Sequence, residues 1–185
     1  MPEPDEIQPP PPELQEFLQK EEDYSERKRA LLEYSDTLEF FAYDRLLDRS
    51  ILRRRVEIEE QGPMVYVPNH RLAFVKARGE EGKVLPTIKR TNEPGDRVWG
   101  VIWEVFTEDW IELERKRKVP RRYFLSECSV KDRGERIMKA LTFKVSRNDL
   151  PEVSPGEEDM RPITEAAHRR GLPDDYIRKL HEMVE

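Results

Sequence analysis

The chain has 185 residues, of which 36% are hydrophobic and 39% are charged, and its formal net charge is −6. This length gives room for one domain of ordinary size with an appendage, but not for two full domains. The negative charge excludes a protein that coats nucleic acid or an anionic membrane with a continuous basic surface, so partners have to be inferred from local sites.

Two segments precede the predicted core. Residues 1–12 contain six prolines and residues 1–24 contain eight acidic side chains, a composition typical of a solvated, disordered tail. Residues 13–36 are rich in helix formers, and hydrophobic side chains recur there at spacings of three, four and seven. We therefore expect an amphipathic helix over 13–36, which either packs on its own domain or docks a partner protein.

Residues 37–185 form the predicted folded domain. Short β-rich stretches alternate there with turn residues, and we expect strands at 38–43, 64–67, 71–76, 98–103, 123–128 and 138–145. Helices are predicted at 44–54 and 108–116, the second with Thr107 as its N-cap. A turn at 93–96 precedes a strand, with Pro94 fixing its own φ and Gly95 adopting a positive φ.

The C-terminal part is predicted to consist of a linker and two helices. Residues 147–162, which are interrupted by prolines and a glycine, form the linker. The helices are expected at 163–170 and 174–184, with Gly171 ending the first and Asp174 capping the second. Because the order of elements is neither regularly alternating nor purely β, we predict a mixed α+β domain with a curved or barrel-like sheet and short flanking helices.

Four motifs occur in order along this domain. They are Phe-Phe-Ala-Tyr-Asp-Arg-Leu-Leu at 40–47, Asn-His-Arg-Leu-Ala-Phe at 69–74, Pro-Gly-Asp-Arg-Val-Trp-Gly-Val-Ile-Trp at 94–103 and Gly-Leu-Pro-Asp-Asp-Tyr at 171–176. Over about residues 38–180 the chain resembles the γ-glutamylcyclotransferase family, in which similar motifs follow in the same order. The resemblance implies the fold of that family and an activity that releases 5-oxoproline from γ-glutamyl amides, including glutathione-related ones.

The implied reaction needs no protein nucleophile. In the family, the free α-amine of the substrate attacks its own γ-carbonyl, while a glutamate on the helix after the Val-Trp-Gly strand transfers protons. Backbone N–H groups of a Tyr-Gly-Ser-Asn loop hold anionic substrate groups and support the oxyanion. The family activity therefore requires both the carboxylate and the loop.

The chain departs from the family at both places. Arg117 stands at the position of the glutamate, and a guanidinium keeps its proton at any physiological pH. Asp-Arg-Leu at 44–46 replaces the glycine, serine and asparagine of the loop. We expect the loop and the helix position to line a pocket for a small anionic ligand, with these residues: Tyr43, Asp44, Arg45, Leu46, Leu47 and Arg117.

Two carboxylates are candidates for a relocated base. Glu114 lies one helical turn before Arg117, and Asp44 lies in the loop itself. The simpler interpretation places Glu114 on a solvated helix surface and makes Asp44 the N-cap of the helix that follows. We therefore assign no catalytic residue from the sequence.

Basic residues on both sides of Arg117 form a second candidate site: Arg115, Lys116, Lys118, Arg121 and Arg122. They predict a binding surface for a phosphate, a nucleic-acid backbone or an acidic partner. The alternatives are a solvated helix end and a contact with the acidic N-terminal tail of the same chain.

The sequence predicts neither a cofactor nor a metal site. His70, His168 and His181 are too scattered for a metal cluster, and no phosphate-loop or dinucleotide motif occurs. The single cysteine, Cys128, suits a reducing compartment. Since no apolar run is long enough for a bilayer and no signal-peptide pattern occurs, we expect a cytoplasmic protein that does not insert in a membrane.

Three functions are compatible with these features. The first is a catalytically degenerate γ-glutamylcyclotransferase-like protein, a pseudoenzyme that acts as a binding or scaffold module. The second is an active enzyme that uses Glu114 or Asp44 as its base, and the third and weakest is a binder of RNA or another anion. The sequence predicts neither the ligand nor the oligomeric state.

Overall fold

The computed structural model describes residues 35–54, 58–147 and 149–184. The predicted acidic tail and all but the end of the predicted helix at 13–36 lie outside these residues. The described elements are β1 (Thr37–Ala42), the 3-10 helix η1 (Arg45–Leu47), α2 (Arg49–Arg53), β2 (Ile58–Pro68), β3 (His70–Lys76), β4 (Val84–Arg90), β5 (Arg97–Phe106), α3 (Thr107–Arg117), β6 (Tyr123–Asp132), β7 (Ile137–Val145), α4 (Glu157–Arg170) and α5 (Asp174–Glu182).

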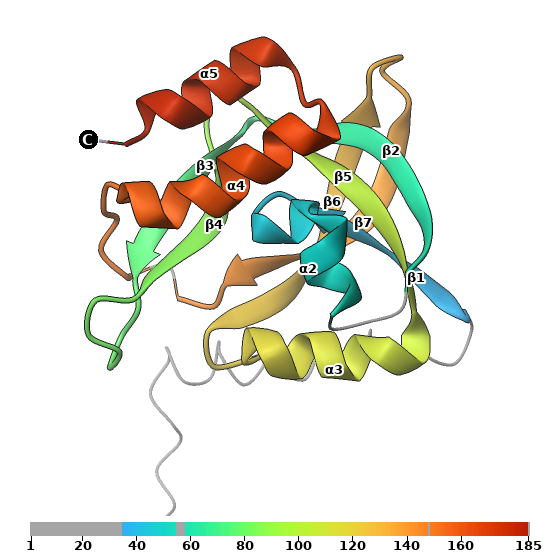
Figure 1. Ribbon diagram of the computed structural model, residues 1–185, viewed down its shortest axis with the longest axis horizontal. Helices are drawn as coiled ribbons and strands as arrows, with labels where there is room; N and C mark the ends of the chain where they lie inside the picture. Colours follow the sequence, from blue (N-terminus) through green and yellow to red (C-terminus); the bar gives the residue numbers. More distant parts are fainter. Residues whose placement is uncertain (1–34, 55–57, 148, 185) are drawn as a thin grey trace, which may run out of the picture. The chain divides into compact units, whose positions relative to one another are not determined.

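Five strands close into a barrel in the order β1, β5, β2, β6, β7 (Figure 1). Neighbouring strands are antiparallel except at the closure, where β1 and β7 pair in parallel with Phe40 opposite Leu141. Closure gives every barrel strand a partner on both sides and so removes free sheet edges. The predicted mixed α+β fold with a barrel-like sheet is confirmed.

The core of the barrel is aromatic. Trp110 of α3 stacks on Phe143 of β7 with ring centroids 5.6 Å apart, and the edge of Phe40 from β1 completes the cluster at 5.8 Å from Trp110. Trp103 of β5 is fully buried and donates its indole N–H to the carbonyl oxygen of Leu46 at 2.9 Å. The barrel core therefore holds both α3 and the η1 segment in place.

A separate two-stranded sheet, β3–β4, lies outside the barrel order, and its second strand is missing from the sequence prediction. β4 contains Pro86, which pairs with Phe74 of β3. Proline lacks the N–H that a strand donates, but an outer strand tolerates it. The backbone carbonyl of Pro86 instead accepts a hydrogen bond from the Tyr123 hydroxyl at 2.9 Å.

The predicted helix at 44–54 is divided into η1 and α2. Asp44 and Asp48 each cap a separate short segment, because their side chains accept hydrogen bonds from the backbone N–H groups of Leu46 and Ser50. The prediction that Asp44 is an N-cap is thus confirmed. The single long helix was wrong because each aspartate starts a segment of its own.

Several predicted boundaries shift by a few residues. α3 begins at Thr107 with Phe106 at the N-cap position, so Thr107 does not cap it. The N-cap position of α5 is Pro173 rather than Asp174, whereas Gly171 ends α4 with a φ of 68°, as predicted. The turn at 93–96 is present, but Gly95 does not adopt the predicted positive φ.

α4 begins at Glu157, inside the predicted linker, and contains Pro162. Three acidic residues in its first turn favour this start, because they face the positive end of the helix dipole. The Asp159 side chain also accepts a hydrogen bond from the Gly156 N–H at 2.9 Å. α4 packs against η1, and α5 packs against α4 (Figure 1). No helix of the described chain is long and apolar enough to cross a membrane.

The contact between β1 and β5 gives a first prediction. A Cβ atom at Gly100 would lie 2.2 Å from the Ala42 carbonyl oxygen and 2.5 Å from the Phe41 ring. We expect Gly100→Ala to lower the free energy of unfolding by about 3 kcal/mol, measured by urea denaturation. Gly95→Ala is the control, since nothing lies within 4 Å of its added Cβ. Equal denaturation midpoints for the two variants would contradict this packing.

Candidate functional site

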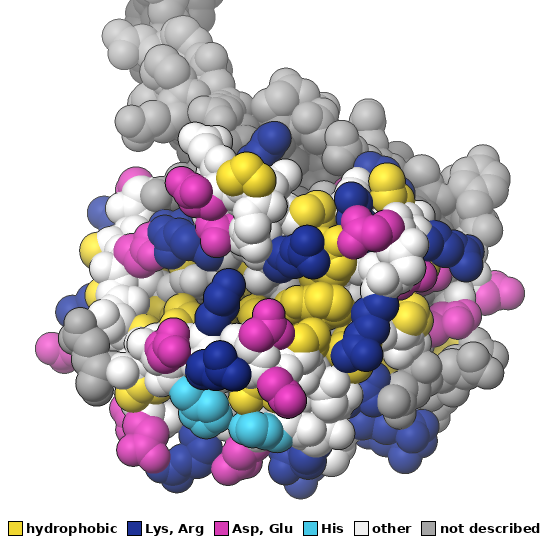
Figure 2. All heavy atoms as spheres, turned by 90° about the horizontal axis from the view of Figure 1, so that it is seen from above, with side chains coloured by type: hydrophobic (Ala, Val, Ile, Leu, Met, Phe, Trp, Pro, Cys, Tyr) yellow, Lys and Arg dark blue, Asp and Glu magenta, His cyan; other side chains and the backbone are white. Residues whose placement is uncertain are grey.

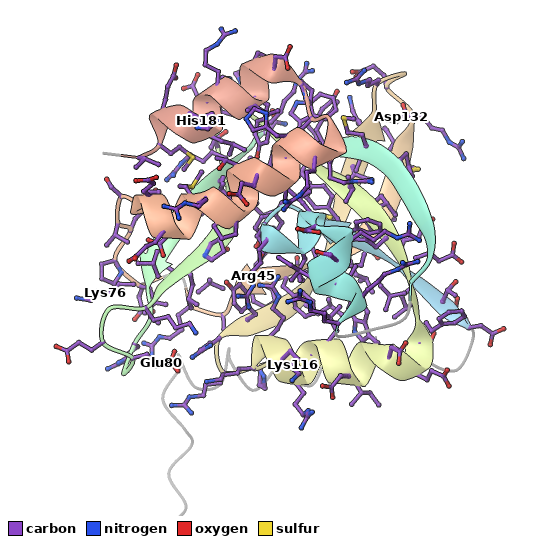
Figure 3. All side chains as sticks on the ribbon, in the orientation of Figure 1. Arg45, Lys76, Glu80, Lys116, Asp132 and His181 are labelled. Atoms are coloured by element: carbon purple, nitrogen blue, oxygen red, sulfur yellow. The ribbon has the colours of Figure 1, made fainter. Side chains whose placement is uncertain are left out.

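A cavity of about 200 Å³ is bordered by η1, the β3–β4 hairpin, the end of α3 and the start of α4. Phe74, Leu85 and Ile163 contribute apolar walls. The charged residues that line it include more cations than acids: Arg45, Lys83, Lys116, Arg117, Arg122, Asp44, Glu158 and Asp159. Figure 3 shows Arg45 between α4 and α3, Lys116 on α3, and Glu80 near the tip of the β3–β4 hairpin.

Asp44 uses both of its carboxylate oxygens within the protein. Its Oδ1 accepts a hydrogen bond from the Leu46 N–H at 2.9 Å, and its Oδ2 lies 2.6 Å from Nη2 of Arg117. The backbone carbonyl of Asp44 accepts a further hydrogen bond from the Leu47 N–H at 2.9 Å. The N–H groups at 46 and 47 are therefore bonded to Asp44 itself.

Arg117 and Asp44 form a buried ion pair. The exposed fraction of Arg117 is 7% and that of Asp44 is 3%. Burial alone would lower the pKa of Arg117, but the adjacent Asp44 carboxylate holds this pKa above its ordinary value. The guanidinium also lies over the rings of Tyr123 and Phe143, at 5.2 and 5.7 Å, and its Nε has no hydrogen-bond partner. Arg117 is thus a permanent cation at the wall of the cavity.

The position of Arg117 follows from the pattern of α3. Trp110, Leu113, Glu114 and Arg117 are the buried residues of this helix, and their spacing of three and four places them on one face. Trp110 anchors that face in the aromatic core. Arg117, two turns later, is consequently directed inward at the end of the helix.

Glu114 does not line the cavity. It is 6% exposed, and its Oε1 accepts a hydrogen bond from the indole N–H of Trp110 at 3.1 Å. The expectation that Glu114 lies on a solvated surface was therefore wrong. Its place on the same face as Trp110 explains the burial, since that face packs on the barrel.

The other residues of the predicted loop divide between packing and lining. Leu46 and Leu47 are fully buried and do not line the cavity, whereas the exposed Arg45 does. The Tyr43 hydroxyl donates to the Phe143 carbonyl at 2.5 Å, and burial raises the pKa of Tyr43 well above its ordinary value. Tyr43 therefore remains a neutral hydrogen-bond donor that ties the loop to β7.

Acidic partners neutralise most of the basic stretch. Arg115 and Lys116 both pair with Glu112, at 2.9 and 3.7 Å. Lys118 and Arg122 both pair with Glu80, and the hydrogen bond from Arg122 lowers the pKa of that carboxyl. These pairs leave little free positive charge along the stretch. Arg121, the remaining residue of the basic stretch, is exposed and lies outside the cavity lining.

Besides the apolar lining residues, sequence reasoning missed four polar residues of the cavity wall. They are Lys83, Tyr123, Glu158 and Asp159. Lys83 comes from the hairpin and the two acids from α4, so no local motif links them to the loop. Burial, followed by the charge of Arg122, lowers the pKa of Lys83.

Comparisons with known proteins agree with the fold of the domain. Residues 97–180, which include β5 and α3, match the AIG2-like family. A solved γ-glutamyl cyclotransferase is 21% identical, with a TM-score of 0.72 over 80% of this chain and 88% of that one. The domain has the fold of the γ-glutamyl cyclotransferases.

Two further solved structures share the fold of this γ-glutamylcyclotransferase-like domain. An uncharacterized protein from Homo sapiens is 21% identical, with a TM-score of 0.72 over 82% of this chain and 89% of that one. A γ-glutamyl cyclotransferase specific to glutathione, from yeast, is 14% identical, with a TM-score of 0.58 over 81% of this chain and 96% of that one. No curated protein matches the chain in sequence.

The buried ion pair between Asp44 and Arg117 gives a second prediction. Asp44→Asn keeps a capping oxygen but leaves Arg117 without a countercharge, and Arg117→Gln leaves the carboxylate unpaired. We expect each to lower the free energy of unfolding by about 3–5 kcal/mol in urea denaturation.

The double variant, which combines Asp44→Asn with Arg117→Gln, provides the decisive comparison. Removing both buried charges should cost clearly less than the sum of the single changes, which a double-mutant cycle measures. Arg115→Gln is the surface control, and it should change stability by no more than about 1 kcal/mol. Additive costs for Asp44 and Arg117 would contradict the pairing.

Proposed function

We propose that this protein is a catalytically degenerate γ-glutamylcyclotransferase-like module that binds a small anionic ligand in the cavity beside Arg117. The observation that carries the proposal is the ion pair between Asp44 and Arg117, at 2.6 Å. It joins the two positions at which the family activity requires a flexible polar loop and a proton-transferring carboxylate. In this chain, the side chains at these two positions bind each other.

The first support is the absence of a base at the end of α3. The Asp44 carboxylate keeps the pKa of Arg117 high, so the guanidinium cannot accept the proton that cyclisation has to remove. General acid–base catalysis contributes about a hundred- to ten-thousand-fold to such reactions. Glu114 is held by Trp110 outside the cavity lining, and Asp44 is held by Arg117.

The second support comes from the loop. In the family, backbone N–H groups of this loop hold substrate anions, as the resemblance implies. Here Asp44 bonds to the N–H groups at 46 and 47 through its side chain and its backbone carbonyl. A substrate carboxylate would have to displace an aspartate that already carries the same charge and is itself paired with Arg117.

The third support concerns the charge that remains in the cavity. Because Asp44 and Arg117 offset each other, the remaining charged residues of the lining are four cations and two acids: Arg45, Lys83, Lys116, Arg122, Glu158 and Asp159. Two of these cations, Lys116 and Arg122, are also paired with acids outside the lining, so Arg45 and Lys83 carry the positive charge that is open to a ligand. A small carboxylate or phosphate is therefore favoured as ligand over a cation. Docking of a protein partner by residues 13–36 remains a prediction, which concerns a segment outside the described residues.

The third prediction tests for the loss of the family activity. The purified protein is incubated with γ-glutamyl amino acids, γ-glutamylamines and glutathione, and 5-oxoproline is quantified. We expect no product above the protein-free blank, because the Arg117 guanidinium cannot take up the proton of the reacting amine and the Asp44 carboxylate is already bound to Arg117. Product that disappears in Glu114→Gln or in Asp44→Asn would instead establish an active enzyme with a relocated base.

The fourth prediction tests for ligand binding. Glutathione, citrate and inorganic phosphate are titrated into the protein by calorimetry at low salt. We expect at least one of them to bind, and Lys83→Gln to weaken its binding by about tenfold, since a direct charge–anion contact is lost. Arg121→Gln is the matched control, because Arg121 does not line the cavity. Equal losses in both variants would indicate nonspecific attraction to surface charge, and no binding at all would remove the ligand from the proposal.

A further inference from the structure

Two histidines that lie far apart in sequence are neighbours at the surface. His168 is in the last turn of α4 and His181 is in the last turn of α5. Their Nε2 atoms are 3.2 Å apart, their ring centroids are 5.5 Å apart, and both side chains are exposed. Figure 2, which views this side of the molecule, shows two histidine side chains next to each other, and Figure 3 labels His181 on α5.

The separation of the two nitrogens suits a shared transition-metal ion. A tetrahedral Zn²⁺ with Zn–N bonds of about 2.0–2.1 Å holds two imidazole nitrogens roughly 3.3 Å apart. Without a metal, the rings are at hydrogen-bond distance. With a metal, each neutral ring would keep its proton on Nδ1 and direct the lone pair of Nε2 to the ion.

The backbone already holds the two rings in this arrangement. Leu172, Ile177 and Leu180 are buried where α5 continues from α4, and Gly171 makes the turn between the helices. Little conformational freedom has to be lost on binding, because the helices are packed before the ion arrives. Each histidine also lies at the carbonyl end of its helix, where the dipole favours a cation.

Charges near the pair do not exclude a cation. Arg169, which follows His168, is paired with Asp48 at 2.6 Å. Glu165 and Glu182 are exposed acidic residues on the same two helices. The described residues contain no group of three or more histidine, cysteine, aspartate or glutamate side chains placed to hold a metal, so water has to complete the coordination.

We propose that His168 and His181 form a two-histidine site for one divalent transition-metal ion of the kind that prefers imidazole, such as Zn²⁺. The ion links the ends of α4 and α5 and leaves its remaining positions to water. Imidazole ligands select zinc, copper and nickel over magnesium and calcium, which prefer oxygen. The two histidines are 13 residues apart in the sequence, and the turn at Gly171 between α4 and α5 brings them together.

Calorimetric titration of the full-length, chelator-treated protein with ZnCl₂ tests the site. We expect one Zn²⁺ per chain, no response to MgCl₂ under the same conditions, and a thermal-unfolding midpoint that rises with the Zn²⁺ concentration. His168→Gln and His181→Gln should each weaken Zn²⁺ binding by more than about tenfold, since losing a ligand costs at least as much as losing one of its supporting contacts.

His70→Gln is the matched control, because it removes the third histidine of the chain but leaves the pair intact. It should bind Zn²⁺ as the unmodified protein does. All three substitutions are checked for an unchanged metal-free unfolding midpoint. Binding that is absent, or that persists unchanged in the double variant of His168 and His181, would overturn the proposal.

Discussion

The site depends on one buried ion pair, between Asp44 at the end of β1 and Arg117 at the end of α3. Removing two charges from water costs free energy, and the attraction between them offsets this cost only while both are present. Either residue alone would leave an uncompensated charge in the core. The Asp44 carboxylate that caps η1 and the Arg117 guanidinium at the end of α3 therefore stabilise the fold only as a pair.

The barrel explains why these two positions meet. β1 pairs with β5 along its whole length, and α3 follows β5 directly, so the helix returns across the barrel with Trp110 in the aromatic core. Two hydrogen bonds then hold the loop in place. The Tyr43 hydroxyl of the loop donates to a backbone carbonyl of β7, and the Trp103 indole of β5 donates to the carbonyl of Leu46 in the loop. The barrel thus brings the loop after β1 and the end of α3 to the same cavity, where Asp44 pairs with Arg117.

The features that could be predicted from the sequence are those that depend on residues close together in the chain. The barrel-like sheet, most strands and the cap at Asp44 could be predicted, because periodicity and capping are short-range signals. β4 was missed because Pro86 is tolerated only at an outer strand, which depends on strand order. Lys83, Glu158 and the His168–His181 pair could not be found, since their proximity arises from packing between distant segments.

The parallel closure of β1 on β7 has a consequence for how the protein is made. Tyr43 and Phe143, which are hydrogen-bonded to each other, are 100 residues apart in the chain. During synthesis the first strand of the barrel must wait for the last one to leave the ribosome, and its edge stays open in the meantime. Such high contact order is typical of slow folding, so the nascent chain is expected to be most vulnerable to aggregation or chaperone capture before residue 145 emerges.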